Sequence, residues 1–114
     1  MNDCLFCKII RGDIPSAKVY EDDLVYAFRD INPQAPTHVL VIPKQHIASV
    51  AAIDEAGDEV IAACLRACRK VAELEGVTES GFRVVSNCGD DACQSVHHLH
   101  FHVLAGRKMT DTMA

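Results

Sequence analysis

Histidine and apolar residues alternate near the C-terminal end of the chain, where residues 97–103 read His-His-Leu-His-Phe-His-Val. Successive side chains of a strand point to opposite faces, so His98, His100 and His102 would share one face of a strand. Two uses of such a face stay open. A pair of imidazoles can chelate a catalytic metal, or one imidazole can act as a nucleophile that the others orient. His38, which opens another apolar segment, could join either arrangement.

Cysteine forms a second pattern, because Cys4 and Cys7 make a C-x-x-C pair. This pair is either two thiols on a helix turn or half of a Cys2His2 zinc site, for which His46 and His98 are available. The N-terminal residues lack the basic and apolar regions of a signal peptide. No apolar run reaches the roughly 20 residues of a membrane span. We therefore expect a soluble cytoplasmic protein with reduced thiols and no membrane partner.

The composition limits the class of ligand. The chain has 114 residues, 49% of them hydrophobic, and a formal net charge of −5. That size and composition predict a single globular domain over residues 1–114. An acidic chain without a basic face is a poor binder of nucleic acid. A small anion held by backbone N–H groups and a few histidines stays possible.

The elements that must position these residues can be read from periodicity and turn signals. We expect a short helix over residues 4–10, a hairpin from residues 18–20 and 25–28, and a buried strand over 38–42. A long helix is predicted over residues 53–75, with Asp54 as N-cap and Gly76 as its stop. Strands over 82–86 and 96–104 complete an α+β domain with a five-stranded antiparallel sheet. The buried stripe expected on the long helix is Val60, Ile61, Cys64, Leu65, Cys68, Val71 and Ala72.

The histidine motif and its flanks resemble a known family. Residues 98–104 match the pattern His-φ-His-φ-His-φ-φ, where φ is apolar, and residues 30–38, 41–47 and 94–96 match its flanks. Over residues 4–109 the chain resembles the histidine triad (HIT) family, and within it the nucleotide-binding proteins that hydrolyse purine nucleoside phosphoramidates. The resemblance implies a HIT-like fold, a sheet extended across a homodimer, and a purine nucleotide ligand of the AMP or GMP type.

The resemblance also implies a role for individual residues. His100 would be the nucleophile that forms a nucleotidyl intermediate, His102 would bind phosphate oxygens, and His38 would orient His100 through a hydrogen bond. Ser95 would contact or protonate the leaving group. The other implied nucleotide contacts are Asn87 and Gln94 to phosphate, Asp30 to ribose, and Phe6, Ile9, Phe28, Ile31 and Leu40 to the base.

The resemblance bears on the metal as well. Bacterial-type members are similar in carrying a structural zinc on residues that correspond to Cys4, Cys7, His46 and His98. With these four so engaged, no catalytic metal is expected. The chain departs from many relatives at Ala92 and Cys93, where they carry two glycines, and a positive φ there would be costly. Its ending, residues 110–114, lacks the Trp-Pro-Pro of animal members.

Three functions are therefore weighed. The first is a nucleoside phosphoramidate hydrolase, and the second is a nucleotide-sensing or protein-interaction module with weak catalysis. The third is a metal-dependent hydrolase. The intact set of His38, Ser95, His100 and His102 favours the first.

Overall fold

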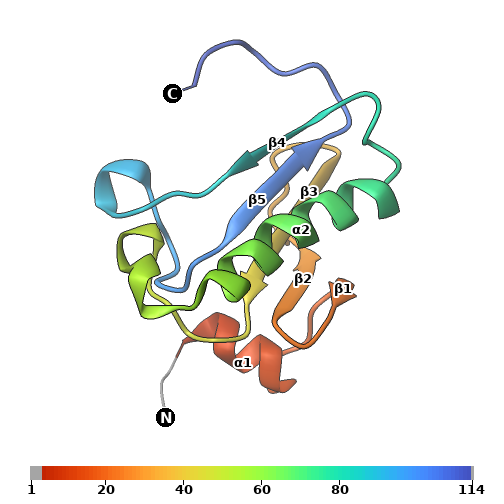
Figure 1. Cartoon of the computed structure of the whole chain (residues 1–114). Helices are drawn as coiled ribbons and strands as arrows, with labels where there is room; N and C mark the ends of the chain where they lie inside the picture. The colour runs from red at the N-terminus through yellow and green to blue at the C-terminus, as the bar shows by residue number, and fades with distance from the viewer. Residues whose placement is uncertain (1–3, 114) are drawn as a thin grey trace.

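A computed structural model gives the fold, and it describes residues 4–113. Five strands form one antiparallel sheet in the order β1-β2-β3-β5-β4 (Figure 1). The strand last in sequence therefore lies between β3 and β4, and the predicted α+β class is confirmed. The strands are β1 (Lys18–Glu21), β2 (Val25–Arg29), β3 (Thr37–Pro43), β4 (Phe82–Val85) and β5 (Phe101–Ala105).

The long helix α2 (Asp58–Leu74) packs its apolar stripe on one face of the sheet (Figure 1). Leu99, Phe101 and Val103 belong to the same core, as the alternation around the histidines predicted. Leu65 was expected in the stripe and is 53% exposed, so that prediction is wrong. Ala67 takes a buried place on the helix instead.

The short helix α1 (Leu5–Arg11) covers the opposite face. Its residues Phe6 and Ile9 share a buried cluster with alternate residues of β2 and β3, which are Tyr26, Phe28, Leu40 and Ile42. The side chain of Cys4 caps the helix, and Gly12, with φ of +86°, ends it. No helix among residues 4–113 is long and apolar enough to cross a membrane.

The predicted helix over residues 53–75 is wrong at its start. A 3-10 turn, η1 (Val50–Glu55), comes first, and α2 begins at Asp58 with Gly57, rather than Asp54, as its N-cap. Ser49 Oγ accepts a hydrogen bond from the Ala51 N–H at 3.1 Å, which caps the 3-10 turn separately. At Gly57 the Glu59 carboxylate fills the space that a Cβ would need.

The predicted strand over residues 96–104 is also too long at its start, because β5 begins at Phe101. The last β3–β5 pair is Val41 with Phe101. Beyond it lies Pro43, which has no N–H to donate to a ladder. The preceding segment turns to the residues after β3 instead, and the Leu99 N–H donates to the Ile47 carbonyl at 2.6 Å.

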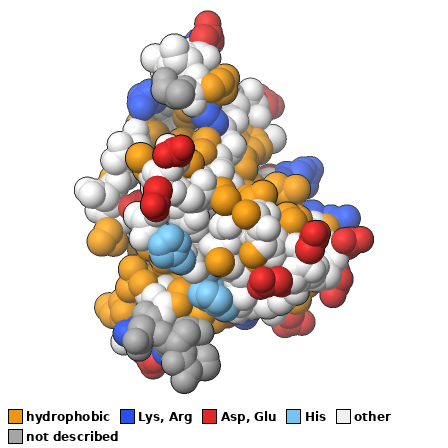
Figure 2. All heavy atoms as spheres, turned by 90° about the vertical axis from the view of Figure 1, so that its left-hand side faces the viewer, with side chains coloured by type: hydrophobic (Ala, Val, Ile, Leu, Met, Phe, Trp, Pro, Cys, Tyr) orange, Lys and Arg blue, Asp and Glu red, His pale blue; other side chains and the backbone are white. Residues whose placement is uncertain are grey.

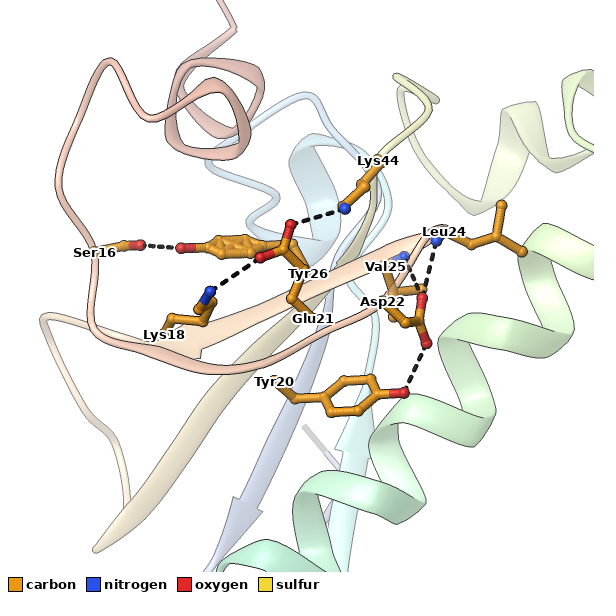
Figure 3. Close-up of polar contacts among 9 residues, drawn as sticks. All are labelled: Ser16, Lys18, Tyr20, Glu21, Asp22, Leu24, Val25, Tyr26 and Lys44. Atoms are coloured by element: carbon orange, nitrogen blue, oxygen red, sulfur yellow. Dashed lines mark hydrogen bonds and ion pairs between the residues drawn. The ribbon is translucent and has the colours of Figure 1, made fainter.

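Side-chain contacts close the β1–β2 hairpin (Figure 3). Asp22 Oδ1 accepts from the N–H groups of Leu24 and Val25 at 2.9 and 3.0 Å, which fixes the turn. Asp22 Oδ2 accepts from the Tyr20 hydroxyl at 2.7 Å. Glu21 bridges to Lys44 at the end of β3, with 2.8 Å between Oε2 and Nζ. The hairpin is therefore tied to β3, the strand that carries His38.

Candidate functional site

Two cysteines and two histidines converge beside the start of α1. Cys4 Sγ lies 3.3 Å from His98 Nδ1, and Cys7 Sγ lies 3.4 Å from His46 Nδ1. The two Nδ1 atoms are 3.2 Å apart, and one donor atom from each residue lies within 4.8 Å of the others. The structure therefore brings together all four residues predicted to hold a metal, from segments up to 94 positions apart in sequence.

These distances fit a tetrahedral zinc ion. At Zn–S of about 2.3 Å and Zn–N of about 2.05 Å, neighbouring ligand atoms of a tetrahedron are roughly 3.3–3.8 Å apart. His98 Nε2 donates its hydrogen to the Pro43 carbonyl at 2.8 Å, so the lone pair of Nδ1 faces the cysteines. Burial lowers the pKa of His98 to about 4. The ring is therefore neutral at neutral pH, as a ligand must be.

The next histidine of the motif has its tautomer fixed by a backbone contact. His100 is buried, and its Nδ1 lies 2.7 Å from the His98 carbonyl oxygen. Because a carbonyl only accepts, Nδ1 carries the hydrogen and Nε2 of the neutral ring keeps its lone pair. The ring packs edge-on against Phe6, with 5.2 Å between centroids. In its neutral form, the His100 ring therefore has its lone pair on Nε2, which suits nucleophilic attack.

His38 and His102 form a hydrogen-bonded pair across β3 and β5. His38 Nε2 lies 2.9 Å from His102 Nδ1. His38 Nδ1 accepts from the Gln34 N–H at 3.0 Å, so the His38 hydrogen is on Nε2 and is donated to His102. The hydrogen of His102 is then on its own Nε2. The resemblance implied a bond from His38 to His100. The structure instead joins His38 to His102, whose ring centroid lies 5.1 Å from that of His100.

Burial keeps this pair neutral. Burial, with smaller contributions from His100 and His38, lowers the pKa of His102 to about 4. Burial also lowers the pKa of His38, and the charge of Asp30 partly opposes this. Asp30 Oδ2 lies 3.4 Å from His38 Nε2. Asp30, His38 and His102 form a second group with donor atoms within 4.8 Å of one another. By residue type this group could also hold a metal.

The loop before the histidine motif places Ser95 at the surface and Gln94 inside. The Gln94 amide accepts from the Gly89 N–H at 2.9 Å and donates to the Ala48 and Val96 carbonyls at 2.8 and 3.0 Å. Here Gln94 holds the loop, and its expected contact to phosphate stays a prediction. Asn87 is half-buried at the start of the same loop.

Four of the five residues expected around a base lie in one cluster. Phe6, Ile9, Phe28 and Leu40 pack together on the α1 side of the sheet. Phe6 contacts both Phe28 and His100, with centroids at 5.5 and 5.2 Å. Ile31 is apart from this cluster and 99% exposed. Figure 2 shows histidine side chains at the surface of one face, beside apolar and acidic groups.

Two backbone groups that fix histidine tautomers were not predicted from the sequence. They are the Gln34 N–H, which fixes the tautomer of His38, and the Pro43 carbonyl, which fixes that of His98. Both are backbone atoms, so no residue type signals them.

Two imidazoles on an antiparallel sheet, a third directly before its strand β5, and a Cys2His2 group beside them define the histidine triad class of protein. The HIT domain family matches residues 11–109, and the chain belongs to this family. It is 43% identical over 112 residues to the purine nucleoside phosphoramidase of Escherichia coli K12, covering 98% of this chain and 94% of that protein. It is 50% identical over 107 residues to a 14 kDa zinc-binding protein of Zea mays, covering 92% and 83%.

Solved structures agree with the family. A HIT family hydrolase from Clostridium thermocellum is 46% identical, superposes with a TM-score of 0.95, and is matched over 100% of this chain and 99% of that one. A histidine triad nucleotide-binding protein from Candida albicans is 34% identical with a TM-score of 0.82, over 98% and 87%.

Proposed function

We propose that this chain hydrolyses purine nucleoside 5′-phosphoramidates through a nucleotidyl intermediate on His100. The observation that carries the proposal is the contact between His100 Nδ1 and the His98 carbonyl, which leaves Nε2 with a free lone pair. Similarity to a purine nucleoside phosphoramidase over 98% of the chain supports the P–N bond as the one that is cleaved.

The reaction has two displacements at the α-phosphorus. His100 Nε2 attacks, the new N–P bond forms, and the P–N bond to the amine breaks while the amine takes up a proton. The exposed hydroxyl of Ser95 contacts this leaving amine and helps to protonate it. Water then attacks phosphorus and gives up a proton, which releases the nucleoside 5′-monophosphate and frees His100. Covalent catalysis replaces one difficult step with two easier ones.

The neighbouring side chains bind the nucleotide. His102 keeps its hydrogen on Nε2, which donates to a phosphate oxygen. Asp30 accepts from the ribose hydroxyls, because an ionised carboxylate is an acceptor only. The cluster of Phe6, Ile9, Phe28 and Leu40 provides the apolar side for the base. Ile31 is exposed and apart from that cluster, and it would close over a bound base from the loop.

A mass measurement tests the intermediate. The intact protein is mixed briefly with adenosine 5′-monophosphoramidate, quenched, and examined for one added adenylyl group. We expect the group on the wild type and on His97→Ala, which alters an exposed histidine. We expect none on His100→Ala, which should keep AMP binding but lose turnover. Turnover at the wild-type rate in His100→Ala would refute the mechanism.

Two other outcomes identify the other functions. If a chelator stops turnover at once in protein that stays folded, the group of Asp30, His38 and His102 points to a metal-dependent hydrolase. If AMP binds and neither adduct nor turnover is seen, the chain is a nucleotide-sensing or interaction module.

We also propose that Cys4, Cys7, His46 and His98 hold a structural zinc ion. The distances between their donor atoms and the zinc-binding relative from Zea mays support this. The ion would supply a closed cross-link between α1 and the segments that flank β3 and β5, with no open position for substrate. Metal analysis of protein purified without added zinc should give close to one equivalent. Less than a tenth of an equivalent, with stability unchanged by chelator, would contradict it.

A further inference from the structure

The segment that follows β5 is fastened to the loop that precedes β3. At Gly106, where φ is +100°, a Cβ would lie 2.7 Å from Pro36 Cβ, so the two segments lie too close together to admit a side chain at position 106. One residue further, Arg107 Nη2 donates to the Gln34 carbonyl at 3.0 Å. Two independent contacts therefore hold residues 34–36 against the end of β5.

The fastened loop is the one that sets the tautomer of His38. Arg107 binds the carbonyl of Gln34. The N–H of the same residue donates to His38 Nδ1 at 3.0 Å. The Gln34 side chain also donates to the Asn32 carbonyl at 3.1 Å, which keeps the loop compact. Contacts thus run without a break from the Arg107 guanidinium through Gln34 to His38 and His102.

We propose that Arg107 is a positioning residue for the histidines: it holds the Gln34 backbone so that His38 keeps its hydrogen on Nε2 and donates it to His102. A guanidinium stays charged in proteins, and its hydrogen bond to a carbonyl is stronger than one between neutral groups. Without that tether the Gln34 N–H has more freedom, and His38 can move its hydrogen to Nδ1. His102 would then lose the donor that fixes its own ring.

The chain supplies a matched control. Arg83 Nη2 donates to the Thr110 carbonyl at 2.9 Å, which is also a contact from a guanidinium to a backbone carbonyl and also involves the segment after β5. Arg83 donates to Thr110 rather than to the loop before β3. Arg107 is exposed and Arg83 is half-buried, and neither side chain belongs to the buried core, so we expect both variants to fold. The variants Arg107→Ala and Arg83→Ala therefore differ in whether the loop before β3 is released.

The first test is an NMR measurement of histidine tautomers on ¹⁵N-labelled protein, which does not depend on any reaction. We expect His38 in the wild type and in Arg83→Ala to carry its proton on Nε2 alone. Arg107→Ala should show both tautomers, or exchange between them, at an unchanged melting temperature. A wild-type spectrum of His38 in Arg107→Ala would overturn the proposal.

The second test is kinetic and rests on the proposed function. Loss of one charge-assisted hydrogen bond predicts a fall in kcat of about tenfold in Arg107→Ala, with KM unchanged. Arg107→Lys, which keeps a cationic donor, should recover part of the lost kcat. A fall in kcat without a tautomer change would also overturn the proposal. If the wild type itself has no phosphoramidase activity, the proposed function fails, and the NMR result still decides the role of Arg107.

Discussion

His98 takes part in two sites at once: its carbonyl oxygen lies 2.7 Å from His100 Nδ1, while its own Nδ1 lies 3.3 Å from Cys4 Sγ. Its main chain fixes the tautomer of the proposed nucleophile, and its side chain belongs to the Cys2His2 group. The position of His100 therefore depends on how firmly His98 is held, and a bound metal would hold it.

Metal removal should lower stability. Replacing Cys7 by Ser removes a buried thiol from the group of four and weakens any bound zinc. We expect the free energy of unfolding to fall by roughly 3 kcal/mol or more, because the affinity for a structural metal contributes directly to folding. Urea denaturation with and without chelator measures it. Cys88→Ser changes an exposed thiol outside the group and should leave both curves in place. Equal effects of the two variants would count against the zinc site.

Acidification should destabilise the fold through His102. Its pKa is lowered to about 4 in the fold, against about 6.5 for an ordinary histidine. Between these values the unfolded chain binds more protons than the folded one, so the free energy of unfolding falls as the pH falls through this window. The contribution is complete above pH 6.5 and amounts to at most about 3 kcal/mol.

The variant His102→Asn isolates this effect. Asn keeps an acceptor near the position of Nδ1 but does not titrate, so the loss of stability between about pH 6.5 and pH 4 should be smaller than in the wild type. His97→Asn, at an exposed position, is the control and should follow the wild type. Chemical denaturation at several pH values measures both. Parallel curves for His102→Asn and wild type would exclude His102 as the cause.

Cys93 is strained, and glycine should relieve the strain. It has φ of +61° and is the one non-glycine residue with positive φ among residues 4–113. A left-handed conformation costs roughly 1 kcal/mol for a residue with a Cβ, and glycine avoids this. We expect Cys93→Gly to raise the free energy of unfolding by about 0.5–1 kcal/mol in urea denaturation. The control is Ala92→Gly in the neighbouring 3-10 turn η2 (Asp90–Ala92), which should not raise the free energy of unfolding. A destabilised Cys93→Gly would show that the loop has another constraint.

The edge strand β4 should mediate the homodimer that the family resemblance implies. It ends the sheet and carries Phe82 and Val84, which are 36% and 37% exposed. A lysine on an edge strand opposes pairing with a second sheet. We therefore expect Val84→Lys to convert a dimer into a monomer in light scattering after size-exclusion chromatography. Leu24→Lys, at 37% exposure beside the hairpin turn at the other side of the sheet, should stay dimeric. A monomeric wild type would refute the dimer.

Structure that follows from hydrophobic periodicity or from turn-forming residues was predictable from the sequence. Gly12 ends α1, and the strand residues 25–28 and 38–42 are buried. Cys64, Cys68 and Val71 recur at helical spacing and face the core. These features depend on local backbone preference and on burial, which residue types reveal. The two cysteines of α2 have their pKa values raised to about 12 by burial, in keeping with their prediction as small apolar residues.

Boundaries and partners were less predictable. The break before α2 depends on Ser49 capping a separate turn, and the late start of β5 depends on Pro43 in its neighbour. The pairing of His38 with His102, rather than His100, follows from the register of β3 on β5, in which Leu40 faces His102. Long-range register is set by the whole sheet, so local sequence does not contain it.

β5 is the last in sequence of the five described strands, yet it lies inside the sheet between β3 and β4. Until β5 has been synthesised, β4 has no neighbouring strand among those described. His38 then also lacks the His102 ring to which it donates. Assembly of the sheet must therefore wait for contacts of high sequence separation, which form slowly. A ligand held by these histidines can stabilise only finished chains. Nascent or C-terminally truncated chains would depend on chaperones and be exposed to proteases.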